Sequence, residues 1–236
     1  MLKELDCKRM LRICTAAFVA LQVVLFPLIQ LLPGKISAIF SYTSIVLVGL
    51  YALVTIRGER SGHILRLGIL FTLFADYFLV LSDDSELRGV LCFCVTQVCY
   101  FVYLLVAEER TRVRIYNAVS RVALSVALVA VAFIVLGDGT DALAIASVLY
   151  YGNLVANVIF AFLRFREERT FAIGLLLFSM CDLCIGLDVL FDSYLELDFA
   201  SSFFYGAHHN LPWVFYQPSQ VLIGLRLGEK SLVNNE

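Results

Sequence analysis

Charged residues are scarce in this sequence, and their scarcity excludes whole classes of protein. Only 16% of the 236 residues are Asp, Glu, Lys or Arg, whereas 61% are hydrophobic, and the mean hydropathy is +0.86. Soluble domains carry about 25% charged residues, so a water-soluble fold of this composition would expose more apolar surface than such folds tolerate. The composition excludes a soluble enzyme and predicts a membrane protein.

Short alternating strands and long polar segments are also missing. A transmembrane β-strand needs about ten residues that alternate apolar and polar side chains, whereas the apolar runs here are long and continuous. A transmembrane α-helix needs about 20 apolar residues, so eight helices would leave only about 76 residues for all tails and connections. We therefore expect an all-α chain that forms a single integral membrane domain over residues 1–236.

Cysteine offers no covalent framework. Five of the seven cysteines lie inside apolar runs, and Cys7 and Cys14 flank the first run, so no pair outside the membrane offers a disulfide. Cys181 and Cys184 have the spacing of a metal-binding pair, but no histidine shares their depth, and we interpret them as packing residues. We expect neither a metal nor another cofactor.

Eight apolar windows between charged or Gly/Pro punctuation predict eight transmembrane helices. The windows cover residues 13–32, 36–56, 64–82, 88–107, 115–136, 141–163, 170–191 and 211–227. The connections between them are short, apart from residues 192–210, which we expect to form a lid or a surface helix. The first window has no cleavage site and is longer than a signal-peptide core, so it is expected to remain as an anchor.

Lys and Arg are sorted between the two ends of these windows. Sixteen of the eighteen fall on the side that holds the N-terminal tail, the connections after the second, fourth and sixth windows, and the C-terminus. Only Lys35 and Arg88 fall on the other side. Because positive charge is retained on the cytoplasmic side, both termini are predicted to be cytoplasmic. The chain is expected to be an integral multi-pass protein, of the cell membrane if it is bacterial.

Two of the windows carry similar motifs that end in aspartate. Residues 68–76 and 174–182 both read Gly, seven residues, Asp, and both motifs follow a basic connection. The similarity reflects either chance or an internal duplication, and a duplication predicts two parallel repeats of four helices. Asp76 and Asp182 each lie about 12 residues into their windows, which places them about 18 Å from the cytoplasmic surface.

A carboxylate in hydrocarbon costs at least about 2.5 to 3.5 kcal/mol, so both aspartates must face a partner or a wet cavity. One interpretation is a buried polar clasp that only holds helices together. The other is a functional pair across one cavity, in which case the carboxyls of Asp76 and Asp182 should lie within about 10 Å of each other.

Further polar side chains fall at a similar depth. Gln97 and Tyr100 share a face of the fourth window, Asn153 and Asn157 share a face of the sixth, and Tyr216 and Gln220 share a face of the eighth. A single such amide commonly serves as a link between helices, but convergence from five helices indicates a cavity that binds a polar ligand. His208, His209 and Trp213 are interpreted as an interfacial belt, with contact to a lipid headgroup as the alternative.

The strings around both aspartates and two further motifs resemble the YhhN family of eight-span membrane proteins, which includes the lysoplasmalogenases. The further motifs are Gln97-x-x-Tyr100 and Trp213-x-x-Tyr216-x-x-x-Gln220. The resemblance covers about residues 60–227 and agrees with the count of eight helices and the short loops. The chain departs from the family pattern at Ala75, Cys181 and Gln97, where Gly, Ser and His are the expected residues.

The resemblance implies hydrolysis of the vinyl-ether bond of a lysoplasmalogen, which gives a fatty aldehyde and a glycerophospho-alcohol. Such a reaction begins with proton delivery to carbon, and a second carboxylate can stabilise the oxocarbenium ion while water attacks. Asp76 and Asp182 would be the acid and base, and burial beside a like charge would keep one of them protonated. Gln97, Tyr100, Asn153, Asn157, Tyr216 and Gln220 would line the substrate site. The expected partners are a lysophospholipid and membrane lipids, with no nucleic acid, and the oligomeric state stays open.

Other functional classes remain as alternatives. A proton-coupled transporter also uses intramembrane carboxyls, although the Gly/Pro-broken helices of many such folds are missing here. An intramembrane aspartyl protease would need a Gly-x-Gly-Asp motif, which does not occur. A scaffold that only binds partners would use the aspartates as a clasp. Release of aldehyde from a lysoplasmalogen would separate the hydrolase from the other three.

Overall fold

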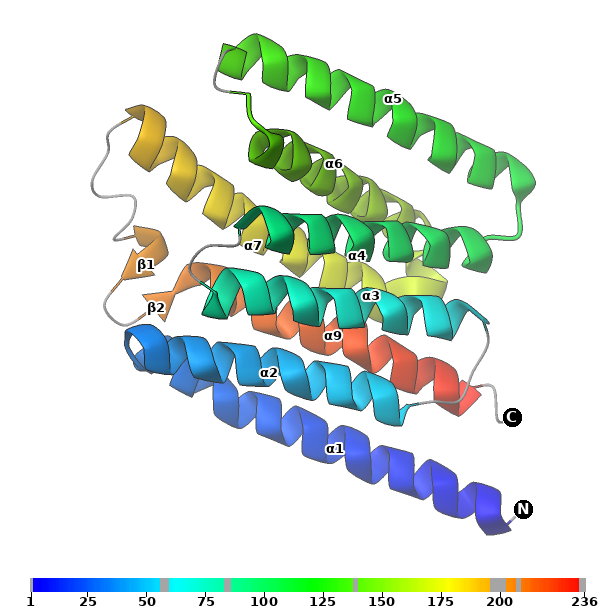
Figure 1. The fold of residues 1–236 in the computed structure, drawn as a ribbon. Helices are drawn as coiled ribbons and strands as arrows, with labels where there is room; N and C mark the ends of the chain where they lie inside the picture. Colours follow the sequence, from blue (N-terminus) through cyan, green and yellow to red (C-terminus); the bar gives the residue numbers. More distant parts are fainter. Residues whose placement is uncertain are drawn as a thin grey trace. The chain divides into compact units, whose positions relative to one another are not determined.

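The computed structural model describes residues 2–55, 60–82, 86–137, 140–195, 203–206 and 209–233. Its long helices are α1 (Leu2–Leu31), α2 (Gly34–Val54), α3 (Arg60–Asp76), α4 (Glu86–Ala107), α5 (Thr111–Leu136), α6 (Ala142–Leu163), α7 (Phe165–Leu195) and α9 (Leu211–Val233) (Figure 1). A π-helix, η1 (Tyr77–Leu81), continues α3, and two-residue strands β1 (Tyr205–Gly206) and β2 (His209–Asn210) form an antiparallel hairpin. The expected all-α class is confirmed.

Seven of the described helices, α1 to α7, are long and apolar enough to cross a membrane, with η1 extending the third of them. The chain is therefore an integral multi-pass membrane protein. Helix α9 forms where the eighth span was expected, but it is not among the seven. Gln217, Ser219 and Gln220 give its centre a polar character, and its passage through the membrane stays a prediction.

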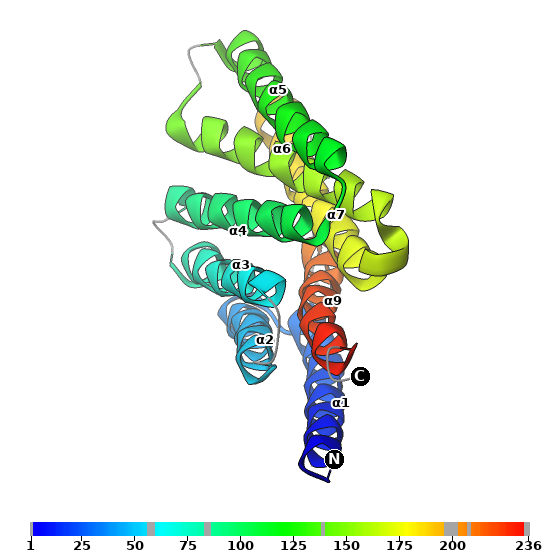
Figure 2. The same cartoon turned by 90° about the vertical axis from the view of Figure 1, so that its right-hand side faces the viewer.

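The described helices form two compact units, and each is described by itself. The first unit comprises residues 1–57 and 173–236, and the second comprises residues 58–172. This division does not follow the midchain boundary that two four-helix repeats would give, so both the parallel repeat and the single membrane domain stay predictions. In the second unit α3 packs on α4, α4 on α6 and α6 on α5, and this row is visible in Figures 1 and 2. In the first unit α1, α2 and α9 contact one another pairwise.

Apolar side chains cover the outside of α5, as contact with lipid requires. Its most exposed residues include Val119, Val122, Val126, Ile134 and Val135, with exposed fractions between 61% and 81%. A soluble helix would place charged side chains on such a face. The same helix ends at Gly137, whose φ of +54° is a left-handed conformation that glycine adopts without strain. The next helix is capped by Asp141, which accepts a hydrogen bond of 2.7 Å from the Ala144 amide.

The connection at residues 192–210 is only partly described. Helix α7 continues to Leu195, Phe203 and Phe204 are helical, and the β1–β2 hairpin follows them. The lid and the surface helix both stay predictions. His208 lies outside the described residues, and Trp213 is half-buried at the start of α9, edge-on to Tyr216.

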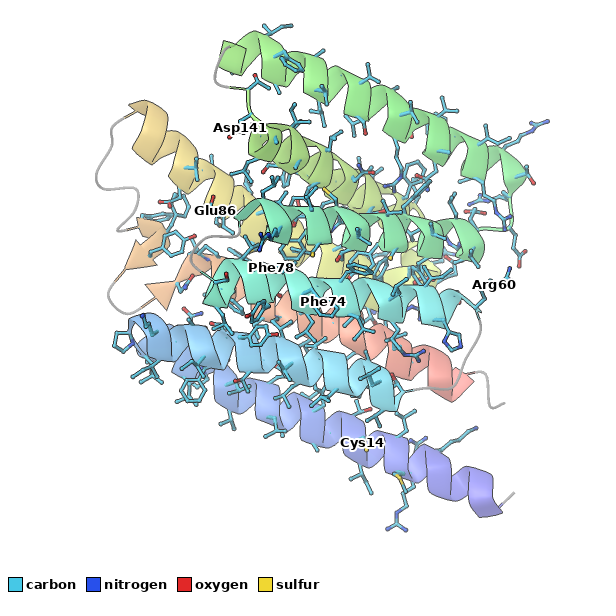
Figure 3. All side chains as sticks on the ribbon, viewed as in Figure 1. Cys14, Arg60, Phe74, Phe78, Glu86 and Asp141 are labelled. Atoms are coloured by element: carbon cyan, nitrogen blue, oxygen red, sulfur yellow. The ribbon has the colours of Figure 1, made fainter. Side chains whose placement is uncertain are left out.

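Charged residues at the helix ends of the second unit follow the expected sorting. Arg60 lies at one end of this unit, and Glu86 and Asp141 lie at the opposite end (Figure 3). Two of the sixteen basic residues assigned to the cytoplasmic side depart from it, because Arg66 and Arg121 are buried inside α3 and α5. They contribute to the interior of the unit and not to the charge of a loop.

The distribution of Lys and Arg predicts which end of the second unit faces the cytoplasm. A cysteine introduced at Glu86 or at Asp141 should react with a membrane-impermeant maleimide added to intact cells, whereas a cysteine at Arg60 should react only after the cells are opened. The unsubstituted chain is the control, since its own cysteines report the background. Labelling of the Arg60→Cys protein in sealed cells would reverse the predicted orientation.

Candidate functional site

Asp76 lies inside the second unit at a break in helix geometry. It is the last residue of α3, only 3% of its surface is exposed, and the chain continues directly into η1. A π-helical turn shifts the face that the following residues present, and such turns are frequent at functional sites. The Asp76 carboxyl is therefore held in the interior of the unit, as a buried charge in a membrane protein requires.

Small residues let α3 and α4 approach closely next to this aspartate. A Cβ atom added at Gly68 would stand 2.6 Å from Cε1 of Tyr100, so only glycine fits beside that ring. One turn further along α3, the Thr72 and Thr96 hydroxyls lie 3.4 Å apart, and Thr96 also donates to the Gly68 carbonyl at 3.2 Å. The glycine of the Gly-x7-Asp motif thus places the Tyr100 ring against α3.

The Tyr100 hydroxyl lies near Thr72 but forms no hydrogen bond of good geometry with the described residues. Helical side chains lean toward the N-terminus of their helix, and the Tyr100 phenol accordingly lies near Thr72 and within electrostatic range of Asp76. The residue is fully buried, yet its hydroxyl has no partner of hydrogen-bond geometry among the described residues. The Nε2 amide of Gln97, one turn earlier on α4, is likewise buried and without a partner in the described chain.

The other side of Gln97 belongs to a satisfied polar network. Asn157 donates to the Gln97 carbonyl and side-chain oxygens at 3.1 and 2.9 Å, and it accepts from Nη2 of Arg121 at 2.7 Å. Nε of Arg121 donates to Asn117 at 2.7 Å, and Nη1 lies 3.4 Å from Asn153. The Arg121 guanidinium also lies over the Phe101 ring, 4.3 Å from its centroid. Asn153 and Asn157 therefore hold an arginine, and Asn157 also fixes Gln97.

Arg121 contacts two residues of the candidate site, and sequence reasoning missed it. It stands near the start of an apolar window and was counted with the cytoplasmic charges, although Asn117 precedes it by one helical turn. Its spacing to Asn117 on α5 matches the spacing of Asn153 and Asn157 on α6. An intramembrane arginine needs several acceptors at one depth. The matching spacings on α5 and α6 could therefore have predicted that Arg121 bonds the asparagines of α6.

Asp182 lies in the first unit, half-buried on α7. The glycine of its motif has the same role as Gly68, because a Cβ atom at Gly174 would stand 2.9 Å from Ile223 and 3.1 Å from the Ser219 carbonyl of α9. One turn further along α7, Phe178 meets the edge of the Tyr216 ring, with centroids 5.3 Å apart. Asp182 follows Phe178 by one more turn and thus lies close to this contact between α7 and α9.

Two glutamines of α9 have side-chain oxygens without partners among the described residues. The amide nitrogen of Gln217 is satisfied, because it donates to the side-chain oxygen of Gln22 at 2.8 Å. The same Gln22 oxygen accepts a hydrogen bond from the Ser44 hydroxyl of α2. Gln220 is fully buried, and its Nε2 donates to Ser219 at 3.3 Å. The Oε1 atoms of both Gln217 and Gln220 are buried and have no donor among the described residues.

A further aspartate of the first unit was also missed. Asp188 lies six residues after Asp182 on α7, and its Oδ1 atom is buried without a partner in the described chain. Burial, with a smaller contribution from Asp188, raises the pKa of Tyr205 in the adjoining hairpin to about 12. Phe204, which directly precedes the hairpin, packs on Cys184 of α7. The expected packing role of Cys184 is consistent with this contact.

The structure brings the expected residues together within each unit. Asp76, Gln97, Tyr100, Asn153 and Asn157 belong to one connected region of the second unit. Asp182, Tyr216 and Gln220 belong to the α7–α9 region of the first unit. The two carboxyls are expected to lie within about 10 Å of each other. Because Asp76 and Asp182 belong to different units, this distance stays a prediction.

Comparison with known proteins assigns the chain to a family. The model of the YhhN family matches residues 36–226, which include both aspartates and all six expected substrate-site residues. The chain belongs to the YhhN family. Neither a search of curated proteins nor a search of solved structures gave a match. Within the described residues of this YhhN protein, no three His, Cys, Asp or Glu side chains are grouped to hold a metal ion.

The close approach of α7 and α9 at Gly174 predicts that two glycine-to-alanine variants of α7 differ in stability. Gly174→Ala should lower the thermal unfolding temperature of the purified YhhN protein, because overpacking against the α9 backbone costs about 1–3 kcal/mol. Gly186→Ala is the matched control on α7, since its Cβ would meet no atom within 4 Å. That variant should be neutral or should gain up to about 1 kcal/mol of helix propensity. Equal unfolding temperatures for the two variants would contradict the packing described here.

Proposed function

We propose that this YhhN protein is a membrane-embedded hydrolase that cleaves the vinyl-ether bond of lysoplasmalogen-type lysophospholipids. Asp76 and Asp182 act as the general acid and base of the reaction. The proposal rests on family membership, on the chemistry of the two carboxyls, and on the buried polar atoms without a described partner in the unit of each carboxyl. It requires the two carboxyls to reach the same scissile bond.

The observation that carries the proposal is the unpaired polar set next to Asp76. A buried donor or acceptor without a partner costs about 1–3 kcal/mol, and native structures contain few of them. The Tyr100 hydroxyl and the Gln97 amide are both fully buried, and neither has a partner among the described residues. A ligand that supplies an oxygen atom as an acceptor to each of these donors would remove this cost. Water and the ether oxygen of the substrate both meet that need.

The two aspartates act one after the other in the proposed reaction. The protonated aspartate transfers its proton to the outer carbon of the vinyl ether, and the carbon attached to oxygen becomes an oxocarbenium ion. The second, ionised aspartate stabilises this cation and accepts a proton from the water that attacks it. The resulting hemiacetal collapses to a fatty aldehyde and a glycerophospho-alcohol. Either aspartate has the chemistry for either role.

The first unit supplies acceptors of the kind that an attacking water needs. The Oε1 atoms of Gln217 and Gln220 are buried without a donor in the described chain, and each can accept a hydrogen from water. Asp182 is half-buried, so it can reach solvent more readily than Asp76. This difference favours Asp76 as the protonated acid and Asp182 as the base.

Replacement of either aspartate separates catalysis from structure. Asp76→Asn and Asp182→Asn keep the size of the side chain and remove its titratable proton, so each variant should fold and bind lysolipid but lose at least about 10²-fold in turnover. The measurement is aldehyde release by the purified protein from a lysoplasmalogen. A saturated alkyl-ether analogue, which cannot form the cation by protonation at carbon, should give no aldehyde with any variant.

Asp141→Asn is the matched control, because Asp141 is exposed and asparagine caps a helix as well as aspartate does. Its turnover should equal that of the wild type. Wild-type aldehyde release from both intramembrane variants would end the catalytic proposal and favour a scaffold. Proton-linked solute flux without aldehyde would assign the aspartates to a transporter.

Tyr100 offers a second test, because removal of its hydroxyl should leave the fold intact. Tyr100→Phe deletes a hydroxyl that forms no hydrogen bond of good geometry with the described residues, so the unfolding temperature should change little. Turnover should fall by about tenfold or more if that hydroxyl orients a reacting oxygen.

Tyr103→Phe is the contrasting variant from the same helix. The Tyr103 hydroxyl donates to the buried Glu168 carboxyl at 2.5 Å, so its loss should lower the unfolding temperature. Full turnover in Tyr100→Phe would remove Tyr100 from the proposed site.

A further inference from the structure

A cleft lies at the basic end of the second unit, where α4, α5 and α6 meet. It is lined by Leu104, Leu105, Glu108, Val113, Arg114, Asn117, Phe160, Leu163 and Arg164. Its enclosed volume is about 10 Å³, which is room for one oxygen-sized group, and beyond that recess the cleft opens outward. The cleft shares no lining residue with the proposed hydrolase site.

Two arginines supply the positive charge of this cleft. Arg164 follows the last turn of α6, and its Nη1 atom is buried without a hydrogen-bond partner among the described residues. Arg114 is exposed on the first turn of α5, and its Nε donates to the backbone carbonyl of Glu108. That bond holds the Arg114 side chain at the cleft and leaves its two terminal nitrogens available. An unpaired guanidinium nitrogen beside a second guanidinium is a site for an anion.

The one carboxylate of the cleft is already neutralised. Glu108 forms a two-pronged ion pair with Arg110, with nitrogen–oxygen distances of 3.0 and 3.1 Å, and the Arg110 amide donates to the same carboxylate at 3.0 Å. The hydrogen bond from the Arg110 side chain, more than any other cause, lowers the pKa of Glu108 to about 2. Glu108 therefore stays ionised and bound to Arg110 at neutral pH. Arg164 interacts with this carboxylate only through a smaller electrostatic contribution, and its Nη1 atom has no hydrogen-bond partner among the described residues.

The remaining walls of the cleft are apolar. Leu105, Val113 and Leu163 lie beside the two arginines, and Leu163 is 64% exposed at the end of α6. Asn117 forms part of the cleft and accepts from Arg121, so a third positive charge lies one layer deeper. A basic rim beside apolar walls at the cytoplasmic end of transmembrane helices is the arrangement that binds the headgroups of anionic lipids.

We propose that this cleft binds the phosphate of an anionic phospholipid of the cytoplasmic leaflet. One phosphate oxygen occupies the recess and accepts from Nη1 of Arg164, and Arg114 binds the phosphate from the rim. The acyl chains follow the apolar walls toward the outside of α5 and α6. The lipid thus links the ends of three helices of the second unit. The proposal does not depend on hydrolase activity.

The test is native mass spectrometry of the full-length protein in detergent, titrated with phosphatidylglycerol or with phosphatidylcholine. The wild type should bind phosphatidylglycerol at least about tenfold more tightly, because the zwitterionic headgroup carries no net negative charge. Arg164→Gln and Arg114→Gln should each weaken phosphatidylglycerol binding by about tenfold, the usual effect of one charged hydrogen bond. Arg112→Gln is the matched control, since Arg112 is exposed on the same turn and does not line the cleft.

Three outcomes would overturn the proposal. The first is equal binding of the two lipids, and the second is a loss in Arg112→Gln as large as in Arg164→Gln, which would indicate diffuse charge attraction. The third uses inorganic phosphate and glycerol phosphate as competitors. Displacement of the lipid by either at the concentration of the lipid itself would assign the cleft to a soluble anion. Unfolding temperatures of all three variants serve as the control for folding.

Discussion

A polar atom buried in a transmembrane protein must find its partner within the protein, because the hydrocarbon of the bilayer offers none. Most of the buried polar side chains described here obey this constraint. Gln22 bonds both Ser44 and Gln217, and these contacts join α1, α2 and α9. Arg121 has an acceptor for each of its three nitrogens. Such satisfied groups hold helices together, and they need no ligand.

Three of the exceptions to this constraint among the described residues belong to the candidate site. Tyr100, Gln97 and Gln220 each have one buried atom without a partner in the described chain, and each belongs to the same compact unit as one of the two motif aspartates. Glycine explains how one of these atoms is brought beside a carboxyl, because Gly68 admits the Tyr100 ring against the helix that carries Asp76. A larger residue at that position would separate α3 from α4. Gly68 therefore accounts both for the close approach of α3 and α4 and for the position of the Tyr100 hydroxyl near Asp76.

Hydrophobic runs predicted seven spans and the helical segment that became α9, because length and apolarity alone decide what crosses a bilayer. The burial of Asp76 followed from the cost of a carboxylate in hydrocarbon, and a similar depth for Gln97 and Asn157 followed from their positions in the apolar windows. Three other features were not predicted. The π-helix after Asp76 packs against α4, the hydrogen bond between Arg121 and Asn157 joins residues 36 positions apart, and Asp188 lies within electrostatic range of Tyr205 in the hairpin. These features depend on tertiary contacts that a periodic pattern does not encode.

We propose that one of the two motif aspartates holds a proton in the membrane interior for transfer to substrate. Infrared spectroscopy of the protein in lipid measures this directly, since the carbonyl stretch of a protonated carboxyl differs from that of a carboxylate. At neutral pH the wild type should show a protonated-carboxyl band that is lost in Asp76→Asn and kept in Asp182→Asn, or the reverse. A band that is unchanged in both variants would show that both aspartates are ionised, and it would contradict the account.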